Sequence, residues 1–324
     1  MRKKSPVLGL ILALLVCLSA SCSGSAPATA SAPLRVEWTL WQGDYTLLVA
    51  NQMGFFKKYS VNVDPVRFDS SSQALSDLAG ARLDGGLFTM SDFLLGSSLA
   101  DIKAVYVSDD KGQYSIVGSP GIHSVSDLQG KRIGLNLHTS AEMYVSDMLK
   151  TAGLTSNDVR YLEMSPDQVI KSSSTQIDAG LVWEPYTTQA IKQGKVVVFQ
   201  SASESLLIPT LVVFRSSVLN QRPQDIRAFI LAWDEAVQYR ISHPQESLAI
   251  ISKATGLTTS DLQATGGISL FTISDNLNLF ASIAGSDPNS IYYIAGINRN
   301  FLVTTGYLTT APAITTLLDP SFLK

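Results

Sequence analysis

The chain has 324 residues, of which 45% are hydrophobic, and its 24 basic against 27 acidic side chains give a net charge of −3. No stripe of Lys and Arg stands out. This argues against nucleic acid binding, which depends on clustered basic side chains that neutralise phosphates. The three histidines lie far apart and outside any metal-binding motif, so the sequence gives no support for a metal site.

The first 21 residues have the layout of a secretory signal peptide. Residues 2–4 are basic, residues 7–18 form an unbroken apolar run, and the small residues 19–21 precede Cys22. The run is shorter than the roughly twenty residues that a helix needs to cross a bilayer. We therefore expect a protein that is exported from the cytoplasm.

Cys22 is placed to carry a lipid. The segment 18–22 resembles a bacterial lipobox, although Ser19 stands where leucine is usual. Acyl chains on Cys22 would hold the protein to a membrane, since each buried methylene contributes roughly 0.8 kcal/mol. Ordinary cleavage near Ala28 or Ala32 is the alternative, and it would release a soluble protein. Residues 22–33 are rich in Ser, Ala, Gly and Pro, which predicts a flexible tether.

The remainder is about 300 residues long, which predicts one large domain or two modest ones. The chain's only cysteines, Cys17 and Cys22, lie in the export segment, so the folded body has no disulfide and no thiol nucleophile. Short β-rich runs then alternate with amphipathic stretches, which predicts a parallel α/β sheet. The predicted strands are Arg35–Trp41, Val61–Phe68, Leu83–Phe88 and Lys103–Val107, and the helices between them are Tyr45–Phe56, Ser72–Leu78 and Ser91–Leu99.

The same alternation restarts after Asp127, which suggests a second lobe. Its predicted strands are Arg132–Leu135, Val159–Glu163, Ala179–Trp183 and Val196–Phe199, and its helices are Ser140–Ala152 and Tyr186–Gln193. Beyond a strand at Leu211–Phe214 the chain becomes helical, with Pro223 and Pro244 each opening a helix and further helices near Thr259 and Ser274. We expect this helical tail to pack on the first lobe.

Four short motifs in a fixed order resemble one family, the nitrate, sulfonate, taurine and thiamine-precursor binding proteins of ABC importers. They are Val49–Lys58 followed by Val61–Val63, Ala79–Gly80 with Leu83–Asp84, Ser126–Gly134, and Trp183–Tyr186 after Asp178 and Ala179. The last seventy or so residues share only the family's helical character. One departure is the first connecting strand, where many relatives carry an acidic residue and this chain reads Gly112 to Ser115.

The resemblance implies a two-lobed periplasmic-binding-protein fold of type II, with two crossover strands and the ligand held between the lobes. The expected boundaries are residues 34–115 for the first part of lobe 1, 116–210 for lobe 2 and 211–324 for the return to lobe 1. The connecting strands near Tyr114–Gly118 and Thr210–Phe214 would act as the hinge. ABC permease subunits are the implied partners. We expect a monomer with no cofactor and no catalytic residues.

Ligands of open α/β sheets bind beyond the carboxyl ends of the strands, near helix N-termini. From the first lobe this selects polar and aromatic residues in three turns, namely Trp41, Gln42, Asp44 and Tyr45, then Ser70 and Ser71, then Thr89 and Met90. The alternative role for Asp44, Ser70 and Ser71 is helix capping, which accounts for these residue types at these positions equally well. Asp92, next to the third turn, is expected to face solvent or the helix end.

From the second lobe the same rule selects His138 and Thr139 before one helix and Trp183 and Glu184 before another. Tyr114 joins them from the first connecting strand. An indole beside a carboxylate suits a flat ligand that stacks on the ring and donates a hydrogen bond. The alternatives are a structural His138, a buried Trp183 and a Glu184 that interacts with the helix dipole.

The candidate ligand-binding residues include more acidic than basic side chains. Asp44 and Glu184 stand against His138 alone, which favours a ligand with nitrogen donors, such as a heterocycle or an amine, over nitrate or a sulfonate. Helix N-termini can bind anions unaided, so an anion stays open. Two other functions also stay open. One is a sensing module for a membrane receptor; the other is an enzyme like the intracellular pyrimidine synthases of similar fold, whose cysteine-rich motif this chain lacks.

Overall fold

The computed structural model describes residues 32–110, 114–200, 208–263, 268–283 and 287–324. The predicted signal peptide and the acylated Cys22 lie outside these residues, as does the tether up to Ser31, so all three remain predictions. No helix in the described part of the chain is both long and apolar enough to cross a bilayer.

The first lobe is built on a six-stranded sheet in the order β11-β4-β10-β3-β1-β2. Strand β1 (Leu34–Trp38) runs parallel to both of its neighbours, β2 (Val63–Arg67) and β3 (Gly85–Thr89). Strand β10 (Thr210–Arg215) is antiparallel to both β3 and β4 (Ile102–Asp110), and β11 (Ser269–Leu270) is antiparallel to β4. The predicted parallel pairing holds for β1, β2 and β3, and a returning antiparallel strand, β10, is inserted between β3 and β4.

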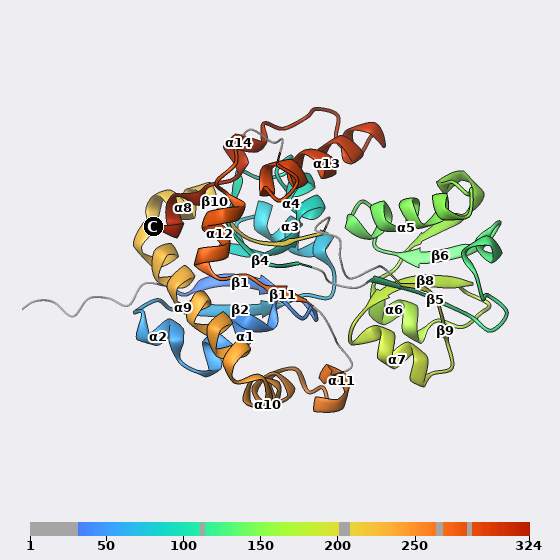
Figure 1. Cartoon of the computed structure of the whole chain (residues 1–324), viewed down its shortest axis with the longest axis horizontal. Helices are drawn as coiled ribbons and strands as arrows, with labels where there is room; N and C mark the ends of the chain where they lie inside the picture. The colour runs from blue at the N-terminus through green and yellow to red at the C-terminus, as the bar shows by residue number, and fades with distance from the viewer. Residues whose placement is uncertain (1–31, 111–113, 201–207, 264–267, 284–286) are drawn as a thin grey trace, which may run out of the picture. The chain divides into compact units, whose positions relative to one another are not determined.

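The second lobe, green in Figure 1, has a five-stranded sheet in the order β7-β6-β8-β5-β9. Its strands are β5 (Tyr114–Gly118), β6 (Arg132–Leu135), β7 (Arg160–Glu163), β8 (Ala179–Trp183) and β9 (Val196–Gln200), with β5 antiparallel to β8 and β9. Tyr114 and Ser115, expected at the end of the first lobe, thus belong to the second sheet, and Thr210 belongs to the first. The two crossovers run from β4 to β5 and from β9 to β10, and residues 111–113 and 201–207 within them are not described.

Helices cover both faces of the first sheet. Those before the first crossover are α1 (Tyr45–Gln52), α2 (Phe55–Lys58), α3 (Ser71–Ala79) and α4 (Met90–Gly96). The single helix predicted for Tyr45–Phe56 breaks because Gly54 has a φ of 73°, a left-handed conformation that glycine adopts readily. The second lobe carries α5 (Ser140–Thr151), α6 (Pro166–Lys171) and α7 (Tyr186–Lys192).

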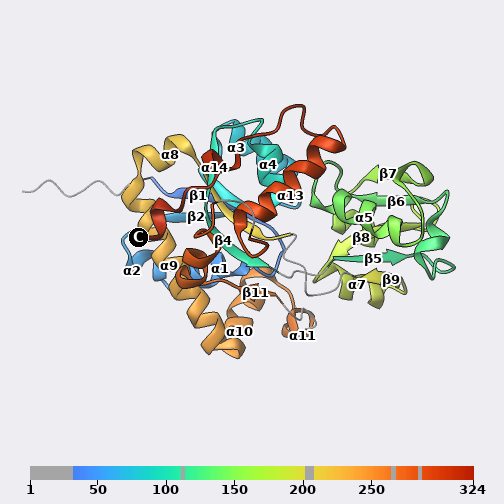
Figure 2. The same cartoon turned by 45° about the horizontal axis from the view of Figure 1, so that its top comes forward.

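The tail is helical, as predicted, and packs on the first lobe. It comprises α8 (Ser216–Gln221), α9 (Pro223–Ser242), α10 (Pro244–Thr255), α11 (Thr259–Gln263), α12 (Ile273–Leu279), α13 (Ile291–Thr304) and α14 (Ile314–Leu317). Helix α9 packs against α1, and α13 against α4, on opposite sides of the sheet, as Figures 1 and 2 show. On α9, Phe229 stacks on Phe56 of α2 with ring centroids 5.2 Å apart.

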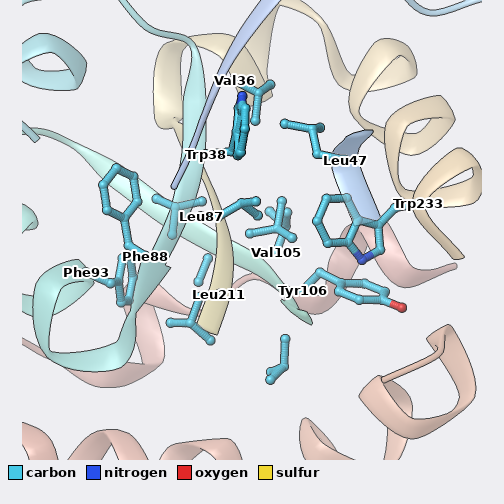
Figure 3. Close-up of a cluster of buried hydrophobic side chains, with 14 of the residues drawn as sticks. Val36, Trp38, Leu47, Leu87, Phe88, Phe93, Val105, Tyr106, Leu211 and Trp233 are labelled. Atoms are coloured by element: carbon cyan, nitrogen blue, oxygen red, sulfur yellow. The ribbon is translucent and has the colours of Figure 1, made fainter. Parts of the chain in front are cut away.

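Large apolar side chains fill the space between the first sheet and its helices (Figure 3). Leu87 of β3, Val105 of β4 and Leu211 of β10 are buried at the centre, and Trp233 of α9 is buried beside Tyr106 of β4. Each such side chain stabilises the fold by about 1.5–3 kcal/mol when it is fully buried. This packing holds the carboxyl ends of the strands in fixed positions, and the turns that follow those ends form the site described next.

Candidate functional site

A cleft between the two lobes lies beyond the strand ends. It encloses a cavity of about 40 Å³, so it has room for only a small ligand in this arrangement. The first lobe and the second lobe both contribute to its lining, which consists of Thr39, Trp41, Asp44, Ser71, Leu87, Thr89, Asp92, Tyr114, Asn136, Thr139, Ser140, Ala141, Trp183 and Thr210.

Three aromatic rings from three segments meet at the cleft. Trp41 follows β1, Tyr114 begins β5 and Trp183 ends β8. The ring centroids of Tyr114 and Trp183 are 5.7 Å apart, and those of Trp41 are 6.0 and 6.2 Å from the other two. Such tilted pairs are favourable for aromatic rings. The Trp183 indole nitrogen also donates to the Leu40 carbonyl oxygen over 3.0 Å, which links the second lobe to the first.

Asp44 fixes the turn after β1. One of its oxygens, Oδ2, accepts hydrogen bonds from the backbone nitrogen and the hydroxyl of Thr39, at 2.8 and 2.9 Å. Asp44 precedes α1 but its side chain makes no capping hydrogen bond, so the capping alternative for Asp44 is wrong. At Gly43 an added Cβ would lie 1.7 Å from the Asp109 carboxylate, so only glycine fits there.

Hydroxyl groups on the cleft lining mark the starts of two helices. The Thr89 hydroxyl accepts a hydrogen bond from the backbone nitrogen of Asp92 at the start of α4. The Thr139 hydroxyl accepts one from Ala141 at the start of α5 and donates to the Asn136 carbonyl oxygen over 2.8 Å. These caps hold the two helix N-termini, one from each lobe, at the cleft.

Three acceptor oxygens on the cleft lining have no hydrogen-bond partner. They are Oδ1 of Asp44, Oδ1 of Asp92 and Oδ1 of Asn136, and all three are shielded from solvent. A buried acceptor without a donor costs about 1–3 kcal/mol, and more when it carries charge. The oxygen and nitrogen of an amide are assigned from their surroundings, so Asn136 could also present its NH₂ group. The two aspartates can only accept when ionised.

The electrostatic environment of the cleft is acidic. Burial raises the pKa of Asp92 to about 6, although nearby donors on Thr89, Ser140 and Ser71 act to lower it. Burial, and then the charge of Glu37, raise the pKa of Asp44 well above its ordinary value. No Lys or Arg is among the described residues that line the cleft.

Two further contacts join the lobes at the edges of the cleft. Tyr307, which follows α13 in the tail, donates its hydroxyl hydrogen to Glu142 of α5, and its ring lies against His138 with centroids 4.8 Å apart. Lys192 of α7 forms an ion pair with Asp261 of α11. The tail therefore packs on lobe 1 as predicted and also reaches lobe 2.

Comparison with known proteins identifies the family. The NMT1/THI5-like family model matches residues 44–247, which is more than half of the chain. The chain belongs to this family. A binding protein of Brucella abortus is 24% identical over 237 residues, which cover 71% of this chain and 74% of the relative.

Solved structures share the fold of this NMT1/THI5-like protein. The alkanesulfonate-binding protein of Xanthomonas axonopodis bound to MOPS has a TM-score of 0.72 and 16% identity, and the match covers 90% of this chain and 99% of that one. The ligand-binding component of an ABC-type import system from Staphylococcus aureus has a TM-score of 0.74 and 15% identity, covering 90% and 97%. The two-lobed type II fold is thereby confirmed, and the Brucella relative and both of these solved structures are binding proteins.

The cleft of this NMT1/THI5-like protein contains part of the predicted set. The residues that the structure brings together are Trp41, Asp44, Ser71, Thr89, Tyr114, Thr139 and Trp183. Six others do not line the cleft. Met90 is buried at the start of α4, and the Ser70 hydroxyl pairs with that of Ser72. Gln42 and Tyr45 face a separate cavity in the first lobe.

His138 and Glu184 also lie outside the cleft lining. His138 packs on Tyr307, and its backbone nitrogen donates to the Glu142 carboxylate over 2.9 Å. Glu184 is half-buried and accepts a hydrogen bond from the backbone nitrogen of Thr188 in α7. This contact places the Glu184 carboxylate at the N-terminus of α7, which agrees with the alternative prediction that Glu184 interacts with the helix dipole.

Sequence reasoning missed several lining residues. Asp92 does not face solvent, because its side chain is 3% exposed; it lies at the start of α4, as the other expectation had it, and lines the cleft. Asn136 directly follows β6, so the rule of strand ends could have selected it. The others that were missed are Thr39, Leu87, Ser140, Ala141 and Thr210.

Among the described residues, no group of three or more His, Cys, Asp or Glu is arranged to hold a metal ion.

Proposed function

We propose that this protein is the extracytoplasmic solute-binding component of an ABC importer and that its cleft captures a small, flat ligand with several N–H donors, cationic or able to become so. The three partnerless acceptors of Asp44, Asp92 and Asn136 carry the proposal. A ligand that donates to them would remove the cost of burying them unpaired. The rings of Trp41, Tyr114 and Trp183 would pack against a planar body.

The same acceptors argue against a simple anion. A nitrate or sulfonate in the cleft would face the carboxylates of Asp44 and Asp92 without a Lys or Arg among the described lining residues. Burying an anion without a partner is costly. The alkanesulfonate ligand of the Xanthomonas protein is therefore not the ligand class that we propose here.

Capture would proceed by closure of the lobes on the ligand. Asp44 and Asp92 come from the first lobe and Asn136 from the second, so a ligand that bonds to all three spans the cleft. A ligand stabilises the closed state only to the extent that it binds that state more tightly than the open one. The closed, loaded form would then dock on permease subunits in the membrane, with the binding protein acting as a monomer.

We propose further that acyl chains on Cys22 anchor the protein to the membrane. Metabolic labelling with an alkyne fatty acid should mark the wild-type protein and not Cys22→Ser, and the variant should move from the membrane fraction to the soluble one. Labelling that survives the substitution would contradict the anchor.

Isothermal titration with matched single-ring probes tests the ligand class. Benzamidine and aminopyrimidine should bind, whereas benzenesulfonate, benzoate and nitrate should not. Asn136→Ala should weaken benzamidine binding about fivefold, the value of one hydrogen bond. Asn157→Ala, an exposed asparagine of the same lobe, is the matched control. Binding of the anions alone would overturn the proposed ligand class.

A further inference from the structure

A second cavity lies within the first lobe. It has a volume of about 340 Å³ and is lined by Gln42, Tyr45, Arg240, Pro244, Ser247, Leu248, Ile251, Leu262, Ile268 and Leu270. The turn after β1 separates it from the cleft, since Trp41 and Asp44 line the cleft while Gln42 and Tyr45 line this cavity. Most of the remaining wall comes from α10 and α11, which lie below α1 in Figure 1, and Arg240 is added from α9.

Two of the residues that line this cavity carry hydroxyl groups without hydrogen-bond partners. The Tyr45 side chain is 2% exposed and Ser247 is 3% exposed, and neither the Tyr45 hydroxyl nor the Ser247 hydroxyl makes a hydrogen bond. A buried hydroxyl without a partner is costly, and in native proteins such groups are almost always paired. Burial also raises the pKa of Tyr45, which keeps its hydroxyl protonated and able to donate.

Arg240 adds a half-buried positive charge to the same wall. Its Nη1 donates to the Thr46 hydroxyl over 2.6 Å and to the Gly43 carbonyl oxygen over 3.4 Å. No carboxylate of the described residues lies within ion-pair distance of Arg240. A guanidinium has five N–H donors, so two bonds from one nitrogen leave donors available for a ligand.

The charges beyond the turn limit what the cavity can accept. Asp44 and Asp109 both act on Arg240 through their charge, and burial raises the pKa of both carboxyl groups. They would repel an anion, so a group with two or more negative charges is disfavoured. A ligand with one negative charge, which accepts hydrogen bonds from the Arg240 guanidinium and from the two hydroxyl groups, is the better match.

We propose that this cavity binds a small monocarboxylate with an apolar body. The carboxylate would accept hydrogen bonds from the Tyr45 and Ser247 hydroxyls and from Arg240. The apolar body would lie against the hydrophobic remainder of the wall, Pro244, Leu248, Ile251, Leu262, Ile268 and Leu270. This site is independent of the ligand that is proposed for the cleft.

Matched probes that differ only in the head group test the site. Phenylbutyrate should bind to the purified protein in isothermal titration, phenylbutanol should bind at least tenfold more weakly, and phenylbutylamine should not bind. Ser247→Ala and Tyr45→Phe should each weaken phenylbutyrate binding about tenfold, because each removes a donor to a charged acceptor. Both changes are small and lie at hydroxyls with no partner, so the fold should persist. Arg240→Gln should abolish binding.

The position of the probe is checked separately from its affinity. In methyl NMR, phenylbutyrate should shift the signals of Leu248, which lines this cavity, and leave those of Leu87, which lines the cleft. Asn136→Ala in the cleft should leave phenylbutyrate affinity unchanged, which distinguishes failure of this site from failure of the cleft proposal. Absence of binding at millimolar phenylbutyrate, equal binding of the amine, or binding unaffected by all three cavity variants would overturn the proposal.

Discussion

Asp92→Asn should change stability and ligand binding in opposite directions. In the protein without ligand, burial raises the pKa of Asp92 from 3.8 to about 6. That difference corresponds to about 3 kcal/mol by which the ionised carboxylate disfavours folding. The neutral amide removes this cost, so the variant should be more stable than the wild type above pH 6. The gain should be at most about 3 kcal/mol, reduced by the free energy of the hydrogen bonds that the substitution removes.

The pH dependence follows from the raised pKa of Asp92. The destabilisation of the folded state by the Asp92 carboxylate is absent below pH 3.8. It grows between pH 3.8 and about 6, because in that range the carboxyl group is ionised in the unfolded chain and still protonated in the folded one, and it is complete above that range. This contribution lowers the free energy of unfolding of the wild type as pH rises through that range, and it is absent from Asp92→Asn. Urea titrations at several pH values measure it.

Ligand affinity should respond with the opposite sign. Benzamidine stays protonated throughout this pH range and needs the ionised carboxylate, so its affinity for the wild type should rise as pH passes about 6. Loss of a charge-assisted hydrogen bond is worth about 1.5–3 kcal/mol, so Asp92→Asn should weaken binding about 10- to 100-fold. The control is Asp147→Asn, whose side chain on α5 is 58% exposed. A variant that binds benzamidine as tightly as wild type, with the same pH profile of stability, would refute the reasoning.

Four further substitutions test the cleft and the residues around it. Trp183→Ala should weaken benzamidine binding at least tenfold because it removes a ring from the aromatic cluster. Glu184→Ala should change the affinity less than twofold in the same titration. Equal losses would contradict the placement of Trp183 inside the cleft and Glu184 outside it. Tyr307→Phe removes the contact with Glu142 across the lobes, so the radius of gyration of the free protein should increase in small-angle scattering, and an unchanged radius would count against that contact. Burial raises the pKa of Glu37 to about 8, so the ionised form disfavours folding and the wild type should lose stability between about pH 4.5 and 8 in urea titrations. Glu37→Gln should lessen that loss, and the same slope in both proteins would contradict it.

Much of the fold could be predicted because local pattern and burial agree. Arg132–Leu135 and Ala179–Trp183 are apolar runs whose predicted bounds coincide with β6 and β8. The order of strands and helices along the chain could be predicted for the same reason. The antiparallel insertion of β10 could not be predicted in this way, since it depends on a pairing between strands more than 100 residues apart in the chain.

The site was predicted as a set of turns but not residue by residue. Strand ends selected the turn whose Trp41 and Asp44 line the cleft, yet Gln42 and Tyr45 of the same turn line the other cavity. Which side of a turn a residue faces depends on the packing of the tail helices, which lies far away in sequence. Asp92 has the sequence context of an ordinary acidic residue in a first helical turn, which is a common and favourable place. Its burial depends on the tertiary fold, which brings Ser71 of the first lobe and Ser140 of the second against its carboxylate.

The balance between the edges and the centre of the cleft suggests how the protein could distinguish a loaded from an empty state. At the edges, the Trp183 hydrogen bond is worth about 1 kcal/mol, the Tyr307 hydrogen bond to the Glu142 carboxylate about 1.5–3 kcal/mol, and the ion pair of the exposed Lys192 side chain less than either. At the centre, closure without a ligand buries the unpaired oxygens of Asp44 and Asp92 at a cost of several kcal/mol. The edge contacts alone do not offset that cost. A ligand that donates hydrogen bonds to the acidic centre does, so the buried carboxylates would act as a selective barrier to closure as well as a binding site.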